Sequence, residues 1–380
     1  RNKRVTAKNR LRKRIIFHFR AKFNALHLQK NRLACKKVGP SGRFCGMLDK
    51  IHNFPTIIDI ILIPDFSLMA FSSAIEPLRL ANRLADRKLY DWRVVSVDGN
   101  SVVSSNGVEI VPSGDLKIIQ KPKLIFVISG YGVQFYDNGK LSSFLRKSAR
   151  EGVVLGAFST GSYVLAKAGL LRDRRCTIHW ENLESFKEVF PDIEVSSDIY
   201  EIDRDRITCS GGTAGLDMML YLIRKQHGDT LAAEISDQFI HDRIREPHSK
   251  QKMALRMRLG VAHPKLVGVV EEMGLNLEDP LSQKELAFKA GISTRQLERL
   301  FSKYMGLTPT RYYLNLRLNR AKQLLDQTNM SILSIALACG FISASHFSKC
   351  FKEYYGRTAR EDRSGRYQTH RQSEVLQVVN

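Results

Sequence analysis

The sequence predicts an α/β sandwich with a mostly parallel sheet, followed by an all-helical domain. Short runs of Val, Ile and Leu alternate with amphipathic stretches in the first part of the chain, whereas no strand-like run follows residue 265. Near-continuous apolar runs are typical of strands covered by helices on both faces. Because 380 residues exceed what one ordinary core organises, we expect two cores. The expected α/β domain spans 54–240, the linker 241–264 and the helical domain 265–363.

Each element of the α/β domain follows from its local pattern. Five apolar runs have the length of strands, and longer stretches with helical spacing of apolar residues lie between them. The expected strands are 57–63, 92–97, 124–128, 153–157 and 207–209. The expected helices are 72–85, 141–150, 162–168, 182–189 and 214–225.

The pattern changes after residue 239. Residues 241–258 are polar, charged and interrupted by Pro247, which favours a linker, and Pro264 precedes a region with helical spacing throughout. Gly and Pro mark the short turns within that region. The expected helices are 265–273, 282–290, 294–304, 311–327, 331–338 and 345–355, and the polar tail 364–380 is expected to be loose.

The net charge of +22 is concentrated at the start of the chain. Residues 1–50 contain sixteen Lys and Arg but a single acid, Asp49, and show no sustained periodicity. We expect a disordered basic leader or a non-native extension, translated upstream of a start near Met47. A transit peptide and a DNA-binding arm are the alternatives. The position of the remaining basic residues therefore matters more than the total charge.

The sequence does not indicate membrane insertion or metal binding. The longest apolar stretch of the body, 57–64, is interrupted by Asp59 and is far shorter than the ~20 residues of a membrane-spanning helix. The six cysteines have no paired CxxC spacing for zinc and are too sparse for a disulfide scaffold. We expect a cytoplasmic protein with reduced thiols and without metal or cofactor.

The helical region contains an internal repeat at an offset of fifty residues. Each copy is a helix that ends near a glycine, a tight turn, a serine that can cap, and a second helix with apolar residues at i and i+4. This order predicts two helix-turn-helix units. The matching residues are Ser293, Leu297, Phe301, Gly306 and Thr308 in the first copy, and Ser343, Phe347, Phe351, Gly356 and Thr358 in the second.

The second helix of each unit is the expected recognition helix. Arginine pairs with guanine, glutamate accepts from cytosine and lysine reaches phosphates, so the outward faces combine base-reading with backbone contacts. The two helices would reach successive major-groove faces about 34 Å apart. A helical interaction module with solvated basic faces is the alternative. The outward residues are Thr294, Arg295, Glu298, Arg299 and Lys303 in the first unit, and Ala344, Ser345, Ser348, Lys349 and Lys352 in the second.

The residues of both units resemble those of a known family. The segments are Leu281-Ser-Gln-Lys-Glu-Leu-Ala287, Gly291-Ile-Ser-Thr-Arg-Gln-Leu-Glu-Arg-Leu-Phe301 and Ala338-Cys-Gly-Phe-Ile-Ser-Ala-Ser-His-Phe-Ser-Lys-Cys-Phe-Lys352. They are similar to the DNA-binding domain of the AraC/XylS transcription regulators. The resemblance implies a partner in double-stranded promoter DNA and action with RNA polymerase. The chain departs from the family at Ala359, where the family has proline; we expect Thr358 to keep its capping role.

A strand, a sharp turn and a helix follow one another in Val153-Val-Leu-Gly-Ala-Phe-Ser159-Thr-Gly-Ser-Tyr. Ser159 at the turn would face the carboxyl edge of the sheet, where such elbows hold a nucleophile or cradle a polar ligand. His179 follows a short strand and could lie beside it. A serine hydroxyl needs an adjacent, oriented base to become a nucleophile. These residues leave open both a ligand pocket and a serine hydrolase or amidase that uses Ser159 and His179.

Together with Ser129-Gly-Tyr-Gly132, the elbow is similar to the class I glutamine-amidotransferase-like, PfpI-type superfamily, which implies a flavodoxin-like sandwich. Enzymes of that superfamily carry a cysteine at the elbow, where this chain has Ser159, and Glu76 matches an acidic residue that they often place near the nucleophile. The elbow cysteine is replaced, and the Ala-x-Ser-x-Gly pattern lacks the first glycine of a hydrolase elbow. We therefore expect no catalysis.

The order of the two domains resembles the GlxA-type branch of the AraC regulators, in which the enzyme-like fold serves as a sensor. Segments 65–82, 179–183, 209–217 and 238–245 resemble regulators of glycine betaine, carnitine and arginine catabolism. The resemblance implies activation by a small effector, either a quaternary ammonium compound bound against an aromatic face or an amino acid, and a homodimer formed by the α/β domain. The expected pocket residues are Glu76, Gly130, Tyr131, Ser159, Thr160, His179 and Trp180.

Overall fold

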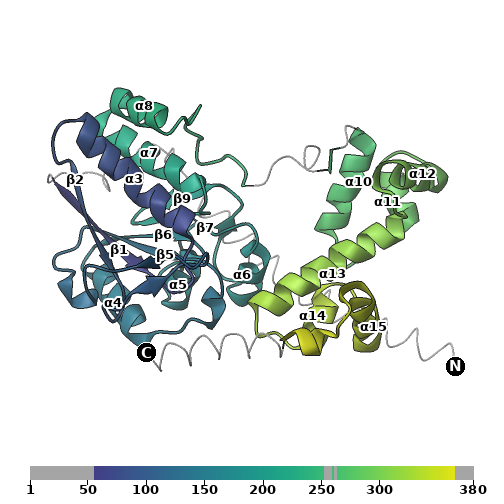
Figure 1. Cartoon of the computed structure of the whole chain (residues 1–380). Helices are drawn as coiled ribbons and strands as arrows, with labels where there is room; N and C mark the ends of the chain where they lie inside the picture. The colour runs from purple at the N-terminus through teal and green to yellow at the C-terminus, as the bar shows by residue number, and fades with distance from the viewer. Residues whose placement is uncertain (1–54, 252–258, 261–262, 364–380) are drawn as a thin grey trace. The chain divides into compact units, whose positions relative to one another are not determined.

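The computed structural model describes residues 55–251, 259–260 and 263–363, which form an α/β part and an all-helical part (Figure 1). The expected leader 1–50 and the tail 364–380 lie outside the described residues. No helix among the described residues is long and apolar enough to cross a membrane. Four cysteines in the described ranges are buried free thiols: Cys176, Cys209, Cys339 and Cys350.

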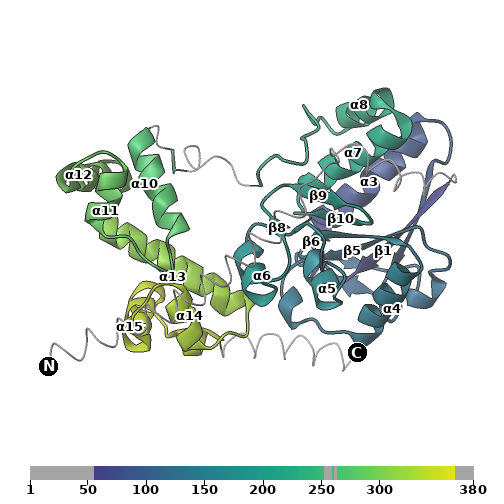
Figure 2. The ribbon, with the colours of Figure 1, turned by 180° about the vertical axis from the view of Figure 1, so that it is seen from behind.

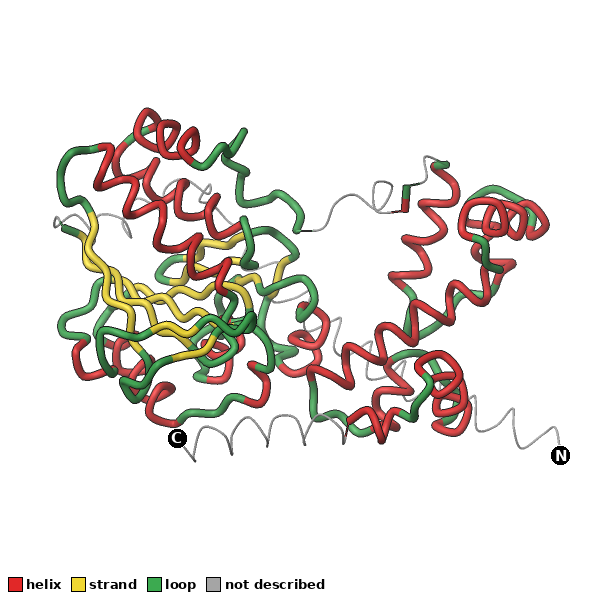
Figure 3. The backbone as a smooth tube through the Cα atoms, in the orientation of Figure 1, coloured by secondary structure: helices red, strands yellow, loops and turns green. Residues whose placement is uncertain are grey.

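The α/β part is built on a six-stranded sheet in the order β2-β1-β5-β6-β10-β9 (Figure 3). Every neighbouring pair is parallel except β10 and β9, which confirms the mostly parallel sheet expected from the apolar runs. The strands are β1 (Thr56–Leu62), β2 (Tyr90–Val95), β5 (Leu124–Ser129), β6 (Val154–Ser159), β9 (Tyr200–Asp203) and β10 (Arg206–Cys209).

Helices cover both faces of this sheet (Figures 1 and 2). One face carries α3 (Leu68–Leu84), α7 (Ala214–His227) and α8 (Asp229–Gln238), which pack on one another. The other carries α4 (Gly139–Arg150), α5 (Gly161–Lys167) and α6 (Leu183–Val189), which share one buried cluster with the inner face of the sheet. The central strands β5 and β6 are buried throughout, so their apolar runs have no polar alternation, as the sequence suggested.

The one acid inside the first strand has a partner on the neighbouring strand. Asp59 of β1 is fully buried, and Arg93 of β2 donates to both of its carboxylate oxygens, at 2.6 and 2.9 Å. Burial raises the pKa of Asp59, and the adjacent guanidinium opposes that shift. The pair explains how a carboxylate can interrupt an otherwise apolar strand of the core.

Several short elements were not expected from the sequence. β9 reads Tyr-Glu-Ile-Asp, too polar for an apolar run, and it forms because it pairs antiparallel with β10 at the edge of the sheet. Helix α8 was also not predicted as a helix, and residues 241–251, the first part of the expected linker, contact the α/β part: the Ile199 N–H donates to the Ser249 carbonyl at 3.0 Å. The remaining short elements are β3 (Val102–Val103), β4 (Glu109–Ile110), β7 (Cys176–Thr177), β8 (Val195–Ser196), η2 (Leu116–Ile118) and η3 (Val133–Phe135).

The helical part is organised around one long helix, α13. Its first half packs through Tyr313 into a cluster with α10, α11 and α12, and its second half packs through Leu318 and Leu324 into a cluster with α14 and α15. Figure 1 shows α13 running between the two groups. The helices are α10 (Pro264–Leu275), α11 (Gln283–Lys289), α12 (Thr294–Met305), α13 (Pro309–Gln327), α14 (Ile332–Ala338) and α15 (Ala344–Tyr355).

Candidate DNA-binding faces and ligand pocket

The first helix-turn-helix unit consists of α11 and α12. Gly291, between the two helices, has a φ of 61°, a left-handed conformation that favours glycine. Ser293 and Gln296 form a capping box: the Gln296 N–H donates to the Ser293 hydroxyl at 3.2 Å, and the Ser293 N–H donates to the Gln296 side chain at 2.9 Å. Leu297 and Phe301 are fully buried, so the rotation of α12 agrees with its sequence period.

The outward face of α12 carries charged groups without an internal role. Arg295, Glu298 and Arg299 are exposed, and none forms a hydrogen bond or ion pair with another described residue. Lys303 is also exposed and lies over the Tyr304 ring, with Nζ 5.1 Å from its centre; Thr294 is half-buried at the start of the helix. These side chains are therefore free to pair with a ligand.

The second unit consists of α14 and α15. A Cβ on Gly340 would lie 2.6 Å from the Leu277 carbonyl oxygen, so both the close approach and a φ of 74° require glycine at this turn. The Ser343 hydroxyl accepts from the His346 N–H at 3.2 Å and caps α15. Phe347 and Phe351 are buried. Of the predicted outward residues, Ser345, Lys349 and Lys352 are exposed, whereas Ala344 and Ser348 are half-buried.

The expected capping role of Thr358 is confirmed. The Glu361 N–H donates to the Thr358 hydroxyl at 3.2 Å, and the Thr358 N–H donates to the Glu361 carboxylate at 2.7 Å. Ala359, which replaces the proline of the family pattern, is 2% exposed. The reciprocal cap supplies the helix start that proline would favour, so the departure from the pattern leaves the local structure intact.

The elbow of the α/β part lies where β6 ends. Ser159, the last residue of β6, has a φ of 59°, and α5 begins two residues later at Gly161. A Cβ on Gly161 would lie 2.3 Å from the Val127 carbonyl oxygen, so only glycine allows the helix to start this close to β5. The Thr160 hydroxyl donates to the Gly130 carbonyl at 2.6 Å. The sharp turn expected at Ser159 is therefore present.

Loops at the carboxyl ends of β1, β5 and β6 meet at this elbow, and the α/β part lines a pocket there. Five of the expected pocket residues line it: Gly130, Tyr131, Ser159, Thr160 and His179. Seven other lining residues of the α/β part were not predicted from the sequence: Asp65, Ser67, Ser105, Gly132, Gln134, Glu181 and Asn182. Asp65 lies three residues after the end of β1, in the loop at the carboxyl end of the first strand, and that position was the signal that could have found it.

Two expected residues stand outside this lining. Glu76, on α3, is half-exposed and pairs with Arg79 of the same helix at 2.6 Å. Trp180 is 37% exposed and stacks beside His179, with 5.5 Å between the ring centres. His179 is held at the elbow by its backbone N–H, which donates to the Ser159 carbonyl at 3.3 Å. Trp180 therefore borders the pocket through His179, whereas Glu76 is engaged elsewhere.

The cysteine that ends β10 does not replace the missing elbow cysteine. Cys209 is fully buried, and burial raises the pKa of its thiol to about 12, so the unreactive protonated form prevails at neutral pH. Its sulfur accepts the Gly211 N–H at 3.3 Å, and Gly211 packs against Ser159. The thiol thus has a structural role in the wall behind the elbow.

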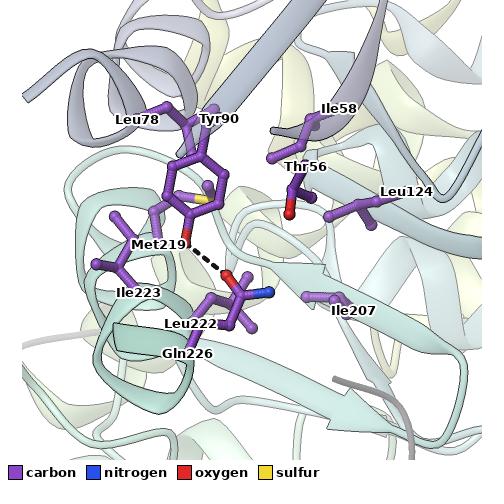
Figure 4. Close-up of a pocket in the computed structure, with 10 residues that line it drawn as sticks. All are labelled: Thr56, Ile58, Leu78, Tyr90, Leu124, Ile207, Met219, Leu222, Ile223 and Gln226. Atoms are coloured by element: carbon purple, nitrogen blue, oxygen red, sulfur yellow. Dashed lines mark hydrogen bonds between the residues drawn. The ribbon is translucent and has the colours of Figure 1, made fainter. Parts of the chain in front are cut away.

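A second cavity, between the sheet and helices α3 and α7, is too small for an effector. Figure 4 shows the Tyr90 hydroxyl pointing at Gln226, to whose side-chain oxygen it donates at 2.5 Å, among apolar neighbours such as Ile207 and Met219. Its volume of about 10 Å³ holds one water molecule at most. Of these two cavities, the pocket at Ser159 is therefore the better candidate for ligand binding.

Comparison with known proteins supports both parts of this description. The pattern of the DJ-1/PfpI family matches residues 60–225, and that of a helix-turn-helix domain matches residues 286–365. The chain is 46% identical to the HTH-type transcriptional regulator GbdR of Pseudomonas aeruginosa, over 82% of this chain and 85% of that protein. The chain belongs to the GlxA-type branch of the AraC regulators.

Two further relatives support this assignment to the GlxA-type regulators. CdhR of Pseudomonas aeruginosa is 45% identical over 80% of this chain and 90% of its own length, and GlxA of Rhizobium meliloti is 38% identical over 79% and 93%. Both are named HTH-type transcriptional regulators. This GlxA-type protein is accordingly a DNA-binding transcription regulator, and the hydrolase alternative finds no support among these relatives.

Proposed function

We propose that this GlxA-type regulator binds promoter DNA through α12 and α15 and activates transcription when a small effector occupies the pocket at Ser159. The free charged face of α12 carries the DNA part of the proposal. Other charges of the helical part are paired internally, such as Lys289 with Glu272 and Lys322 with Asp362. Against that background, the unpaired Arg295 and Arg299 on a capped, well-packed helix have the chemistry of base recognition.

The two recognition helices offer different contacts. Arg295, Glu298 and Arg299 of α12 can hydrogen-bond to base edges in the major groove. Lys349 and Lys352 of α15 reach toward phosphates. The small residues Ala344, Ser345 and Ser348 let α15 approach the groove closely. The first unit would thus contribute most of the hydrogen-bond readout.

A mobility-shift assay of the full-length chain on the DNA upstream of its own gene tests this proposal. Arg299→Ala is expected to weaken binding by about tenfold to a hundredfold, because a bidentate arginine–guanine contact contributes about 1–3 kcal/mol. Arg172→Ala is the matched control, since it removes one exposed positive charge from a turn of the α/β part. If the two variants bind alike, and unrelated duplexes bind as well as the upstream DNA, the helical part is an interaction module instead.

The chemistry of the pocket favours a small molecule that carries a positive charge. The α/β part lines it with the carboxylates of Asp65 and Glu181 and with the exposed ring of Tyr131, and it contributes no lysine or arginine to this lining. An aromatic face and nearby carboxylates attract a cation, and a quaternary ammonium group in particular. The Ser159 hydroxyl and the His179 ring offer donors to the carboxylate of a zwitterion. A quaternary ammonium compound or an amino acid fits this arrangement.

Calorimetry on the full-length chain with glycine betaine, carnitine, choline and arginine distinguishes these ligand classes. Tyr131→Ala is expected to weaken binding of a quaternary ammonium compound by about two- to fivefold, since a cation–π contact at an exposed ring contributes about 0.5–1 kcal/mol. Tyr131→Phe keeps the ring and is expected to retain the affinity. Equal losses in both variants would contradict a cation held on the ring.

Activation and assembly complete the proposal. A homodimer formed by the α/β part would bring two pairs of recognition helices to one promoter, where an activator acts with RNA polymerase in the cytoplasm. A transcriptional reporter is expected to respond with a rise when the effector is added, and sedimentation to give twice the mass of the chain. A fall in reporter output would identify a repressor, and a monomer bound to DNA would exclude the dimer.

A further inference from the structure

The segment that leaves the α/β part toward the DNA-binding helices, residues 240–251, is here called the strap. Its first anchor is Asp217 of α7, which is fully buried. The carboxylate of Asp217 accepts from the Arg245 backbone N–H at 2.7 Å and from Arg245 Nε at 2.8 Å, and His241 Nε2 lies 2.9 Å away. Arg245 also donates to the Thr213 hydroxyl at 2.7 Å. Four polar contacts thus converge on one short stretch of chain.

The second anchor holds the other end of the strap. The Gln251 side-chain amide lies within 3.0 Å of three acceptors: the Thr177 hydroxyl and the carbonyls of Ile178 and Asp198. Lys250 donates to the Asp198 carboxylate at 2.6 Å, and that carboxylate is 2% exposed. The strap also forms an isolated antiparallel bridge at this point, between Asp198 and Lys250.

Both anchors adjoin the wall of the effector pocket. Thr213 lies two residues after Gly211 in the same turn. A Cβ added to Gly211 would lie 2.8 Å from the Ser159 Cβ, so this turn packs directly on the elbow. At the other anchor, Ile178 precedes His179, whose N–H donates to the Ser159 carbonyl. Each end of the strap is therefore one contact away from a segment that touches Ser159.

We infer that the strap transmits occupancy of the pocket to the DNA-binding helices, because its two anchors rest on the segments that enclose Ser159. The inference rests on the proposed binding of an effector at that serine. The buried Asp217 carboxylate is costly to leave without its strap partners His241 and Arg245, so the first anchor favours two discrete states, docked and released, over gradual loosening. A ligand that moves either segment changes the balance between these states, and along the sequence the strap precedes α10, with residues 252–258 and 261–262 outside the described part of the chain.

Hydrogen–deuterium exchange of the full-length chain tests the strap without any ligand. Arg245→Gln removes contacts at the first anchor, and Gln251→Glu sets a carboxylate against the three oxygens of the second. In Arg245→Gln, the amides of the strap and of the distant segment 176–182 are expected to exchange about fivefold faster or more. In Gln251→Glu, the amides of the strap and of segment 209–217, which adjoins the first anchor, are expected to exchange faster by a similar factor. Arg243→Gln is the matched control, an exposed strap arginine without a partner among the described residues.

Each outcome decides the inference. If the strap exchanges faster in the variants while the opposite segment of the pocket wall does not, the strap is an independent tether and the inference is wrong. If Arg245→Gln fails to fold, the exchange rate of segment 209–217 in Gln251→Glu decides whether the two anchors are coupled. Added glycine betaine that protects the peptide containing Ser159 but leaves the strap unchanged also overturns the inference, while the proposed effector site stands. Glycine betaine that protects neither peptide counts against that effector alone, because the ligand-free comparison still decides the strap.

Discussion

Arg317 of α13 donates its Nε–H to the carbonyl oxygen of Cys339 across 2.7 Å, and its guanidinium lies 4.2 Å from the centre of the Phe341 ring. Cys339 ends α14, where helix carbonyls lack partners within the helix, and Phe341 lies in the turn that leads to α15. One side chain of the central helix therefore positions the turn of the second helix-turn-helix unit. Burial lowers the pKa of Arg317, which is consistent with a structural rather than a solvated arginine.

Arg317→Met is expected to lower the free energy of unfolding of the helical part by about 1–3 kcal/mol, because it leaves a helix-end carbonyl without its charged donor and removes the ring contact. Urea denaturation followed by circular dichroism measures the loss. Arg311→Met, on an exposed position of the same helix, is the control and is expected to change little. Equal midpoints for the two variants would show that Arg317 does not hold the turn.

The capping box of α11 predicts a dependence of stability on pH. The Glu285 carboxylate accepts the Ser282 N–H at 2.8 Å, and this bond lowers the pKa of Glu285 below its usual 4.5. A lowered pKa in the folded state gives stability that is present above pH 4.5 and is lost as the pH falls through the folded value.

Glu285→Gln keeps an acceptor but no longer titrates, so the fall of the urea midpoint between about pH 5 and pH 3 is expected to be shallower than in the unsubstituted chain. Glu271→Gln, on the exposed face of α10, is the comparison and is expected to keep the original slope. A Glu285→Gln profile that parallels the original chain would contradict this assignment.

Gly161→Ala is expected to destabilise the α/β part by about 1–3 kcal/mol, because the added methyl would overlap the Val127 carbonyl at 2.3 Å and push α5 from the elbow. Thermal unfolding detects the change. Gly139→Ala is the matched control at the start of α4, where nothing lies within 4 Å of the added carbon. There the substitution is expected to be neutral or slightly stabilising, since alanine favours the helix. A Gly161→Ala variant that melts above Gly139→Ala would show that the close approach of α5 to β5 does not require glycine.

Lys352→Ala is expected to weaken DNA binding similarly on all sequences and to reduce the slope of log affinity against log salt by about 1, because it removes one phosphate contact. Arg299→Ala, by contrast, is expected to reduce discrimination between bases at one position. Titrations at several salt concentrations separate the two effects. An unchanged salt slope for Lys352→Ala would place that lysine away from the phosphates.

The sequence predicted most of the local structure because helix and strand periods, capping serines and turn glycines act over a few residues. The rotation of α12 follows from Leu297 and Phe301, and the capping role of Thr358 follows from its place in the repeat. Edge strand β9 was missed because its four residues alternate apolar with acidic side chains and form no apolar run, and its stability comes from pairing with β10.

The sequence alone determined that the chain has an α/β part with a serine elbow and a helical part with two capped recognition helices, since these depend on short-range patterns. Only the tertiary structure decided which loops meet at that elbow: it brought Asp65 and Glu181 to the pocket and left Glu76 outside its lining. The same holds for the strap on Asp217 and for Arg317 at Cys339. Such contacts join residues far apart in the chain, and their existence depends on the packing of whole layers, which no local pattern encodes.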